Sequence, residues 1–175
     1  MKFVLPGPEY EEQAREYICE FQQCQSNING CAGLDEYLQE RSYAEWVKQV
    51  MDDLDMAGVT MGKVPSFTYF YVNDEGDRII GMVNIRLSLH DFWQMEGGHV
   101  GYSIRPTERG KHYATNLLME ALGLCKILGL DEAVLSCAKS NVASARVIKN
   151  CGGVLEAEFY SSVFGEEIQR YLIEL

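Results

Sequence analysis

The stretch from His99 to Cys137 constrains the fold of this chain more than any other part of the sequence. It begins with an apolar strand, "HVGYSI", continues through the basic loop "RPTERGK", and enters a segment with apolar residues at helical spacing that ends at Gly129. The next apolar run, "AVLSC" at 133–137, is too short for a helix and has polar neighbours, which is typical of a buried strand. A strand, a crossover helix and a second strand form a βαβ unit, so we predict an α/β protein.

Predicted hairpins flank this unit on both sides. The runs "SFTYFYV" and "RIIGMVNIRLSL" are rich in β-branched and aromatic residues and are separated by the turn-forming "NDEGD". In the second run, Gly81, Val83 and Ile85 alternate with Met82 and Asn84, which predicts a half-buried strand. The runs "VLEAEFYSSV" and "EIQRYLIEL" form the last predicted hairpin, around "FGEE".

Three other segments have the periodicity of amphipathic helices. One opens with the capping box "SYAE" at 42–45 and is expected to close at Gly58. The other two are residues 8–25 and 142–150. Together with the strands, these helices predict a mixed sheet covered by helical layers.

The whole chain is expected to form one domain. Its 175 residues are 47% apolar, and lengths of roughly 100–200 residues are typical of single domains. No apolar run reaches the ~18 residues of a membrane span, and Pro6-Gly7-Pro8 interrupts the N-terminus before a signal-peptide apolar region forms. The sequence therefore predicts a soluble, cytoplasmic protein that does not interact with membranes.

The six cysteines are predicted to be reduced, because no secretion signal accompanies them. Cys19, Cys24 and Cys31 lack CxxC spacing and have no nearby His, so we expect no metal site. The formal net charge of −11 argues against nucleic acid as a partner. The same acidity mildly favours cationic substrates such as amines.

The basic loop before the predicted helix has the composition of an anion site. A helix N-terminus offers unpaired N–H donors and the positive end of the helix dipole, and Gly110 allows a ligand to approach the backbone closely. Arg109 and Lys111 add positive charge to the same loop. These features point to a phosphate or pyrophosphate, although loop chemistry alone leaves ordinary solvated charges as an equal alternative.

The stretch "GGHVGYSIRPTERGKHYATNLLMEAL" and the later "NVASARVIKNCGG" together resemble the acyl-CoA-binding core of the GNAT superfamily of N-acyltransferases. With "GGHVGY" before the loop and "GGVLE" after the last helix, the chain is most similar to a bacterial subgroup of predicted acetyltransferases. The resemblance covers residues 67–175 and implies a mixed, mostly antiparallel twisted sheet with a central βαβ unit and flanking helices. Residues 1–66 match only as two generic helices, in the region where the family usually builds its acceptor site.

The resemblance also implies a function and a set of cofactor-binding residues. The implied reaction transfers acetyl from acetyl-CoA to a primary amine, on a small molecule or a peptide, by direct attack in a ternary complex, without a metal. A non-catalytic acyl-CoA-binding or sensing module is the alternative, and the sequence leaves a homodimer open. CoA is expected between strands 99–104 and 133–137. The implied binding residues are Ser103, Ile104, Arg109, Gly110, Lys111, His112, Tyr113, Ala114, Thr115, Asn141 and Ser144.

Two positions depart from the family pattern. His112 stands where the loop usually has its first Gly, so its imidazole either points outward or adds a titratable donor to the phosphates. Ile148 stands where many members have a Tyr that protonates the leaving thiolate. Tyr113, Tyr160 or water would have to replace that acid.

The candidates for deprotonating the amine precede the first strand of the unit. His99 occupies a place where the family often has a Glu, and imidazole titrates near neutral pH. A hydrogen-bonded structural histidine is an equally good interpretation of His99. Glu96 is the second candidate base, with a simple loop charge as its alternative, and His90 and Asp91 are weaker candidates for holding the acceptor.

Overall fold

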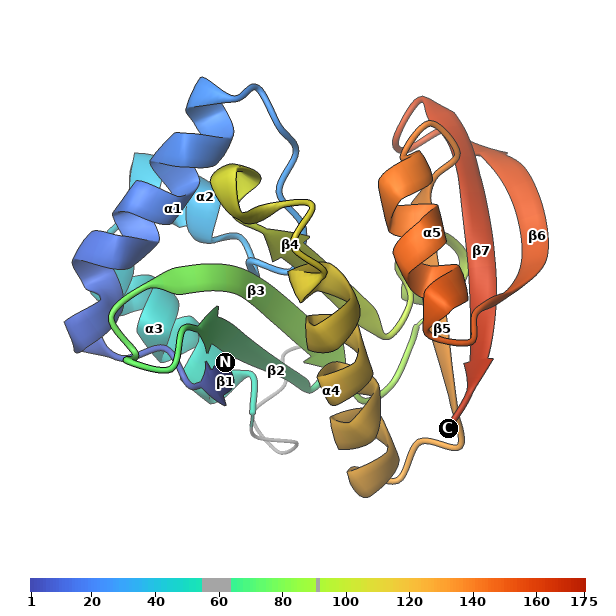
Figure 1. The fold of residues 1–175 in the computed structure, drawn as a ribbon, viewed down its shortest axis with the longest axis horizontal. Helices are drawn as coiled ribbons and strands as arrows, with labels where there is room; N and C mark the ends of the chain where they lie inside the picture. Colours follow the sequence, from blue (N-terminus) through green and yellow to red (C-terminus); the bar gives the residue numbers. More distant parts are fainter. Residues whose placement is uncertain (55–63, 91) are drawn as a thin grey trace.

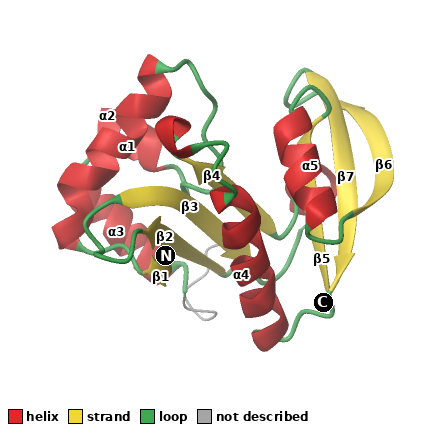
Figure 2. Cartoon of the chain, in the orientation of Figure 1, coloured by secondary structure: helices red, strands yellow, loops and turns green. Residues whose placement is uncertain are grey.

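The chain folds into two antiparallel sheets with helices packed against them (Figures 1 and 2). This computed structural model describes residues 1–54, 64–90 and 92–175. The first sheet has the order β1 (Lys2–Val4), β2 (Ser66–Val72), β3 (Ile79–Arg86), β4 (Val100–Ile104). The second sheet has the order β5 (Glu132–Ala138), β7 (Glu166–Glu174), β6 (Val154–Ser161).

Five α-helices and three shorter helical turns lie among the described residues. The α-helices are α1 (Glu11–Gln23), α2 (Leu34–Glu40), α3 (Tyr43–Asp52), α4 (Tyr113–Ile127) and α5 (Val142–Asn150). The shorter turns are η1 (Pro8–Tyr10), η2 (Trp93–Gly97) and η3 (Pro106–Glu108). Within the described residues, no helix is long and apolar enough to cross a membrane.

The predicted fold class is confirmed, and the crossover has a particular arrangement. Helix α4 connects β4 to β5 as the sequence indicates, but these two strands belong to different sheets. Among the described residues, only an isolated bridge between Gly98 and Leu135 joins the two backbones there. The crossover unit therefore links two sheets that separate from each other, instead of two paired strands of one continuous sheet.

Two apolar cores lie on opposite faces of the first sheet. Helices α1–α3 cover one face, where Trp46 and Phe21 pack with Phe70 and Met82. Helix α4 covers the other face with Leu117 and its neighbours and shares its core with α5. Figure 1 shows α1–α3 gathered on one side of β3 and α4 between the two sheets.

The expectation of a half-buried β3 is wrong, because helices cover both faces of this strand. Met82 is fully buried under α1–α3, and Asn84 is 4% exposed. The Asn84 amide donates to Ser66 Oγ at 3.1 Å and to Thr68 Oγ1 at 3.0 Å, so this buried polar group is paired. The alternation in the sequence therefore separates two buried faces.

The predicted helices are present, but some of them begin or end at residues other than those predicted. The segment predicted as 8–25 consists of η1 followed by α1, and the capping box of α3 is confirmed by reciprocal bonds between Ser42 and Glu45. The expected end at Gly58 lies outside the described residues, and α3 itself ends at Asp52. The sequence interpretation missed β1, α2, η2 and η3, all of which are short.

Candidate active site

The start of α4 carries a run of unpaired backbone donors. Gly110 and His112 both have left-handed backbone conformations, with φ of 77° and 64°, and α4 begins at Tyr113. Among the described residues, none accepts a hydrogen bond from the backbone N–H groups of residues 110–115. These donors and the positive end of the helix dipole favour an anion at this position.

The two cations of the loop are already engaged with protein groups. The Arg109 Nη2 donates to Ser26 Oγ at 2.8 Å, and its Nε donates to the Ile104 carbonyl at 3.2 Å. Lys111 Nζ lies 2.8 Å from Glu108 Oε2, and this hydrogen bond raises the pKa of Lys111. Both side chains are exposed, so their positive charge still contributes to the potential around the loop.

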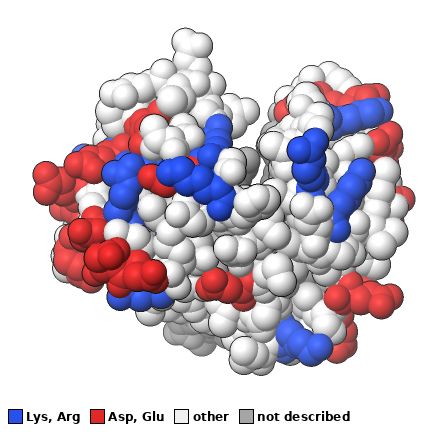
Figure 3. All heavy atoms as spheres, viewed as in Figure 1, with Lys and Arg blue, Asp and Glu red and all other residues white. Residues whose placement is uncertain are grey.

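The space-filling view shows a hollow between the part of the molecule with η3 and the part with α5 (Figure 3). Lys and Arg side chains lie on both sides of this hollow, while most Asp and Glu side chains of this face lie farther out. An acidic protein thus presents a locally basic rim beside the start of α4.

The strand register decides which β4 backbone groups a ligand between the sheets can reach. Arg86 N–H donates to the His99 carbonyl, and Arg105 N–H donates to the Ile80 carbonyl. Because antiparallel pairs alternate, the backbone groups of Tyr102 and Ile104 point away from β3, towards β5. The sequence interpretation named Ser103 and Ile104 for this role, and the register favours Tyr102 and Ile104.

Ser103 faces the N-terminal helices. Its hydroxyl lies 3.1 Å from the Tyr17 hydroxyl on α1, and the residue is 8% exposed. Burial raises the pKa of Tyr17 far above its usual range, so its phenol stays protonated. Ser103 therefore joins β4 to α1 and turns its side chain away from α5.

His99 joins the beginnings of β4 and β5. Its N–H donates to the Val134 carbonyl at 2.7 Å, and its Nδ1 accepts from the Val134 N–H at 2.9 Å. Burial, together with the nearby Arg86, lowers the pKa of His99. Neutral His99 therefore has its proton on Nε2, and the nitrogen that could take a proton already accepts a structural bond.

Glu96 lies in η2 with one buried and unpaired carboxylate oxygen. No described residue makes a hydrogen bond to its Oε2. The neighbouring Arg86 guanidinium lies 3.6 Å from the centre of the Trp93 ring and donates to the Gly98 carbonyl at 3.1 Å. Burial lowers the pKa of Arg86 to about 10, which still leaves it charged near neutral pH. Glu96 is thus the candidate base that keeps a free acceptor.

A hollow of about 500 Å³ lies beside His99, between the end of β3 and the beginning of β5. Asp131 and Glu132 lie at its rim and are exposed, and Gln94 adds an amide. His90 lies near this region, with its ring 6.4 Å from that of Trp93. Asp91, the other weak acceptor-binding candidate, lies outside the described residues.

Helix α5 contributes its first turn to the site. Asn141 caps the helix, because its Oδ1 accepts from the Ser144 N–H at 3.1 Å. The Ser144 hydroxyl lies 3.1 Å from the hydroxyl of Tyr102, which projects from β4. One turn later, Ile148 is 1% exposed and belongs to the apolar core. The Tyr102 side chain is the site feature that the sequence interpretation missed.

The two tyrosines that the sequence named as replacement acids lie elsewhere. Tyr113 is the first residue of α4, beside the unpaired backbone donors. Tyr160 lies on β6 and is 67% exposed, and strand β7 separates β6 from β5. Because neighbouring strands are about 4.8 Å apart, Tyr160 lies on the order of 10 Å across the sheet from β5.

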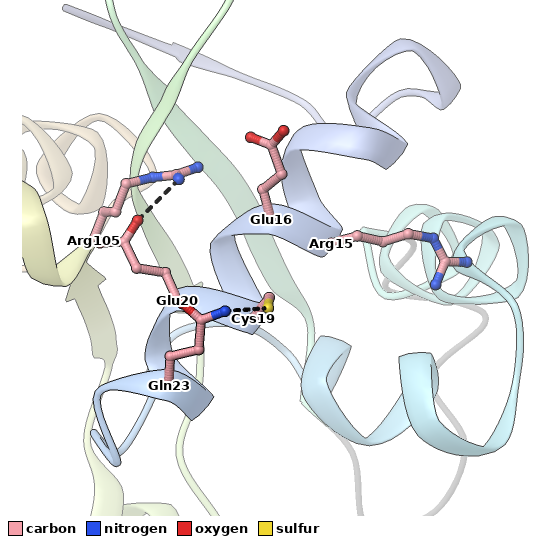
Figure 4. Close-up of a pocket in the computed structure, with 6 residues that line it drawn as sticks. All are labelled: Arg15, Glu16, Cys19, Glu20, Gln23 and Arg105. Carbon is pink, nitrogen blue, oxygen red and sulfur yellow. Dashed lines mark hydrogen bonds and ion pairs between the residues drawn. The ribbon is translucent and has the colours of Figure 1, made fainter.

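A second pocket, of about 450 Å³, is lined by residues of α1 and by Arg105, which precedes η3 (Figure 4). Its buried member, Arg105, donates to Glu20 Oε2 at 3.1 Å and to the Ile79 carbonyl at 2.8 Å. Glu20 also accepts from the N–H and the hydroxyl of Thr107, each at 2.8 Å, and these hydrogen bonds lower the pKa of Glu20 against the effect of its burial. These contacts fix the segment before the unpaired donors to α1.

Within the described residues, no group of three or more His, Cys, Asp or Glu side chains could hold a metal ion. The six cysteines are free thiols, as predicted.

The comparisons with known proteins agree with this architecture. A family model described as "Acetyltransferase (GNAT) domain" matches residues 1–154. The match includes residues 1–66, for which the sequence resemblance identified only generic helices. No curated protein sequence matches the chain.

Several solved structures share the fold at low sequence identity. The microcin C7 self-immunity acetyltransferase MccE, in complex with acetyl-CoA and AMP, has a TM-score of 0.70 and 17% identity, over 99% of this chain and 91% of that one. A ribosomal-protein-S5-alanine acetyltransferase from Vibrio fischeri has a TM-score of 0.70 and 17% identity, over 98% and 91%. A spermidine N-acetyltransferase from Vibrio cholerae has a TM-score of 0.64 and 16% identity, over 99% and 95%.

Proposed function

The chain belongs to the GNAT acetyltransferase family, and from that premise we propose that it transfers acetyl from acetyl-CoA to a primary amine by direct attack in a ternary complex. The observation that carries this proposal is the run of unpaired N–H groups at residues 110–115. They are the donors that a pyrophosphate requires, and they lie at the start of the helix between the two sheets.

The chain's own residues support a path for the cofactor from this loop. With the pyrophosphate at 110–115, the pantetheine arm would extend along the free edge of β4, past the outward backbone groups of Ile104 and Tyr102. Amide groups of the arm can bond there in the manner of an added strand. The thioester would then lie between β4 and β5, near the point where the sheets separate.

For the amine proton, the contacts favour Glu96 over His99. Acyl transfer needs a neutral amine and therefore a base or a water path. The Nδ1 of His99 accepts the Val134 N–H, whereas Glu96 Oε2 has no partner among the described residues. We assign proton removal to Glu96, directly or through water, and give His99 the role of holding the strand junction.

A screen for thiol release from acetyl-CoA tests the proposed function. Acceptors would include polyamines, amino acids, amine-bearing antibiotics and peptide N-termini, because the solved relatives include enzymes named for spermidine and for ribosomal protein substrates. We expect amine-dependent release of CoA thiol with at least one class. Tight CoA binding without release by any class would instead indicate a non-catalytic acyl-CoA-binding module.

A further inference from the structure

On α5, the position that the family resemblance assigns to the proton donor for the leaving thiolate holds an apolar side chain. When the acyl–sulfur bond breaks, the electron pair goes to sulfur, and a nearby acid helps that step. At the position where the resemblance implies a Tyr, this chain has Ile148, which is 1% exposed and apolar. The following inference rests on the proposed acetyl transfer and concerns which residue supplies that proton.

Tyr102, on β4, places its phenol beside the face of α5 that carries Ser144 and Ile148. It lies on β4, in the first sheet, and its hydroxyl is 3.1 Å from Ser144 Oγ on α5, which packs against the second sheet. Ser144 and Ile148 are four residues apart and therefore neighbours on one helix face. The Tyr102–Ser144 hydrogen bond thus crosses the space between the separating sheets, one turn from Ile148.

We propose that Tyr102 is the general acid that protonates the CoA thiolate, with Ser144 orienting its hydroxyl. The amine nitrogen forms a bond to the acetyl carbon and loses one proton to Glu96 or water. The carbon–sulfur bond breaks, and sulfur takes the proton of the Tyr102 hydroxyl. The resulting phenolate regains a proton from water, so one amine and one acetyl-CoA give one amide and one CoA thiol.

The surroundings of Tyr102 keep its proton available. Burial raises the pKa of Tyr102 to about 12, so the phenol is protonated at neutral pH. Burial also raises the pKa of the neighbouring Cys137 thiol, and a CoA sulfur in the same space would experience the same desolvation. A desolvated thiolate is a stronger base, which offsets the reluctance of a buried phenol to release its proton.

The other tyrosines fit this role less well. Tyr113 lies at the pyrophosphate end of the cleft, a whole pantetheine arm away from the thioester in the proposed binding mode. Tyr160 projects from β6, the strand of the second sheet farthest from β5. Among the three, Tyr102 alone has a side-chain bond to α5.

The test compares Tyr102→Phe with Ser144→Ala and with Tyr160→Phe as a matched control. General acids contribute about 10²–10⁴-fold in rate, so Tyr102→Phe should lower kcat by at least about 10²-fold, with the KM for acetyl-CoA and the melting temperature little changed. Ser144→Ala should lower kcat less, because the phenol remains. Tyr160→Phe should match the wild type.

A second readout does not depend on turnover. The pKa of the thiol in bound CoA can be followed by its thiolate absorbance in the ultraviolet. Tyr102 stabilises the thiolate by donating a hydrogen bond, so this pKa should be higher in Tyr102→Phe than in the wild type and unchanged in Tyr160→Phe.

The two readouts separate the possible failures. An unchanged kcat and an unchanged thiol pKa in Tyr102→Phe would overturn the assignment, as would a large loss of kcat in Ser144→Ala with none in Tyr102→Phe. A wild-type protein that binds CoA with a Tyr102-dependent thiol pKa but releases no thiol would support the Tyr102 contact and contradict the proposed acetyl transfer.

Discussion

The polar groups at the two ends of β4 differ in whether they have hydrogen-bond partners. At its end, the loop that leads into α4 leaves the N–H groups of residues 110–115 unpaired. At its beginning, His99 and Val134 satisfy each other through both a backbone and a side-chain bond. Unpaired donors at an accessible helix start suit a ligand, whereas the paired junction suits a fixed point from which the two sheets diverge.

The difference shows that candidate residues close in sequence can have different roles. His99 and Gly110 both belong to the segment that resembles the family core. The loop around Gly110 presents backbone donors without a partner among the described residues, whereas the acceptor nitrogen of His99, Nδ1, is already bonded to Val134 inside the protein. The loop should therefore determine cofactor affinity, and the junction should determine stability.

The largest expected effect concerns the ligand that the loop holds. CoA and dephospho-CoA should bind with similar affinity, because both carry the pyrophosphate, and pantetheine should bind at least about 100-fold more weakly, since it loses several charge-assisted hydrogen bonds. Isothermal titration calorimetry measures all three. Equal affinities for CoA and pantetheine would contradict the role of the loop.

His99→Ala should mainly destabilise the protein. It leaves the buried Val134 N–H without an acceptor, which costs about 1–3 kcal/mol of unfolding free energy, whereas CoA affinity should change little. His99→Gln keeps an acceptor and should recover part of the loss in denaturant unfolding. A tenfold lower kcat in His99→Gln, at wild-type stability, would instead make His99 the catalytic base and contradict its assignment to the strand junction.

The pH dependence of unfolding provides a control for His99. Its folded-state pKa is lowered by burial and by Arg86, so between that pKa and the unfolded value of about 6.5 the unfolded chain binds more protons. The unfolding free energy should therefore rise with pH across this window and decline as pH falls through it. That part of the pH dependence should disappear in His99→Gln.

Gly110→Val should weaken CoA binding by about tenfold, because a branched side chain beside the loop amides disfavours the left-handed conformation that exposes them. Gly165→Val is the matched control. Gly165 has a φ of 70° against 77° for Gly110, both have open space at the Cβ position, and Gly165 lies in the turn between β6 and β7. We expect both variants to lose similar stability and only Gly110→Val to lose CoA affinity. Equal CoA affinities of the two variants would contradict the role of the loop.

The smallest effect is expected for His112→Gly. Removing the Cβ removes the strain of a left-handed conformation at a non-glycine residue. The unfolding free energy should rise by at most about 1 kcal/mol, since glycine also gains freedom in the unfolded chain. CoA affinity should be kept or rise slightly. His112→Ala retains the strain and loses the imidazole, so a drop in CoA affinity in both variants would assign the imidazole a direct contact with the phosphates.

Local sequence patterns predicted much of the fold. Periodicity and turn residues identified both hairpins, α4 and α5, since these segments are long and their signals are local. The three-residue β1 and the seven-residue α2 carry too few positions for a periodic signal. The burial of β3 on both faces depends on which helices return to cover it, and that information lies far away in the chain.

For the site, the sequence by itself predicted the loop as a candidate anion site, because Gly110 and the start of α4 place free N–H donors within a few consecutive residues. Only the tertiary structure decided the state of the side chains around it. The bond from His99 Nδ1 to Val134 spans 35 positions, and that from Tyr102 to Ser144 spans 42. Hydrogen bonds between residues so far apart depend on how strands and helices pack, so the sequence could name His99 as a titratable group but could not indicate that its nitrogen was already occupied, nor that a phenol from β4 meets α5.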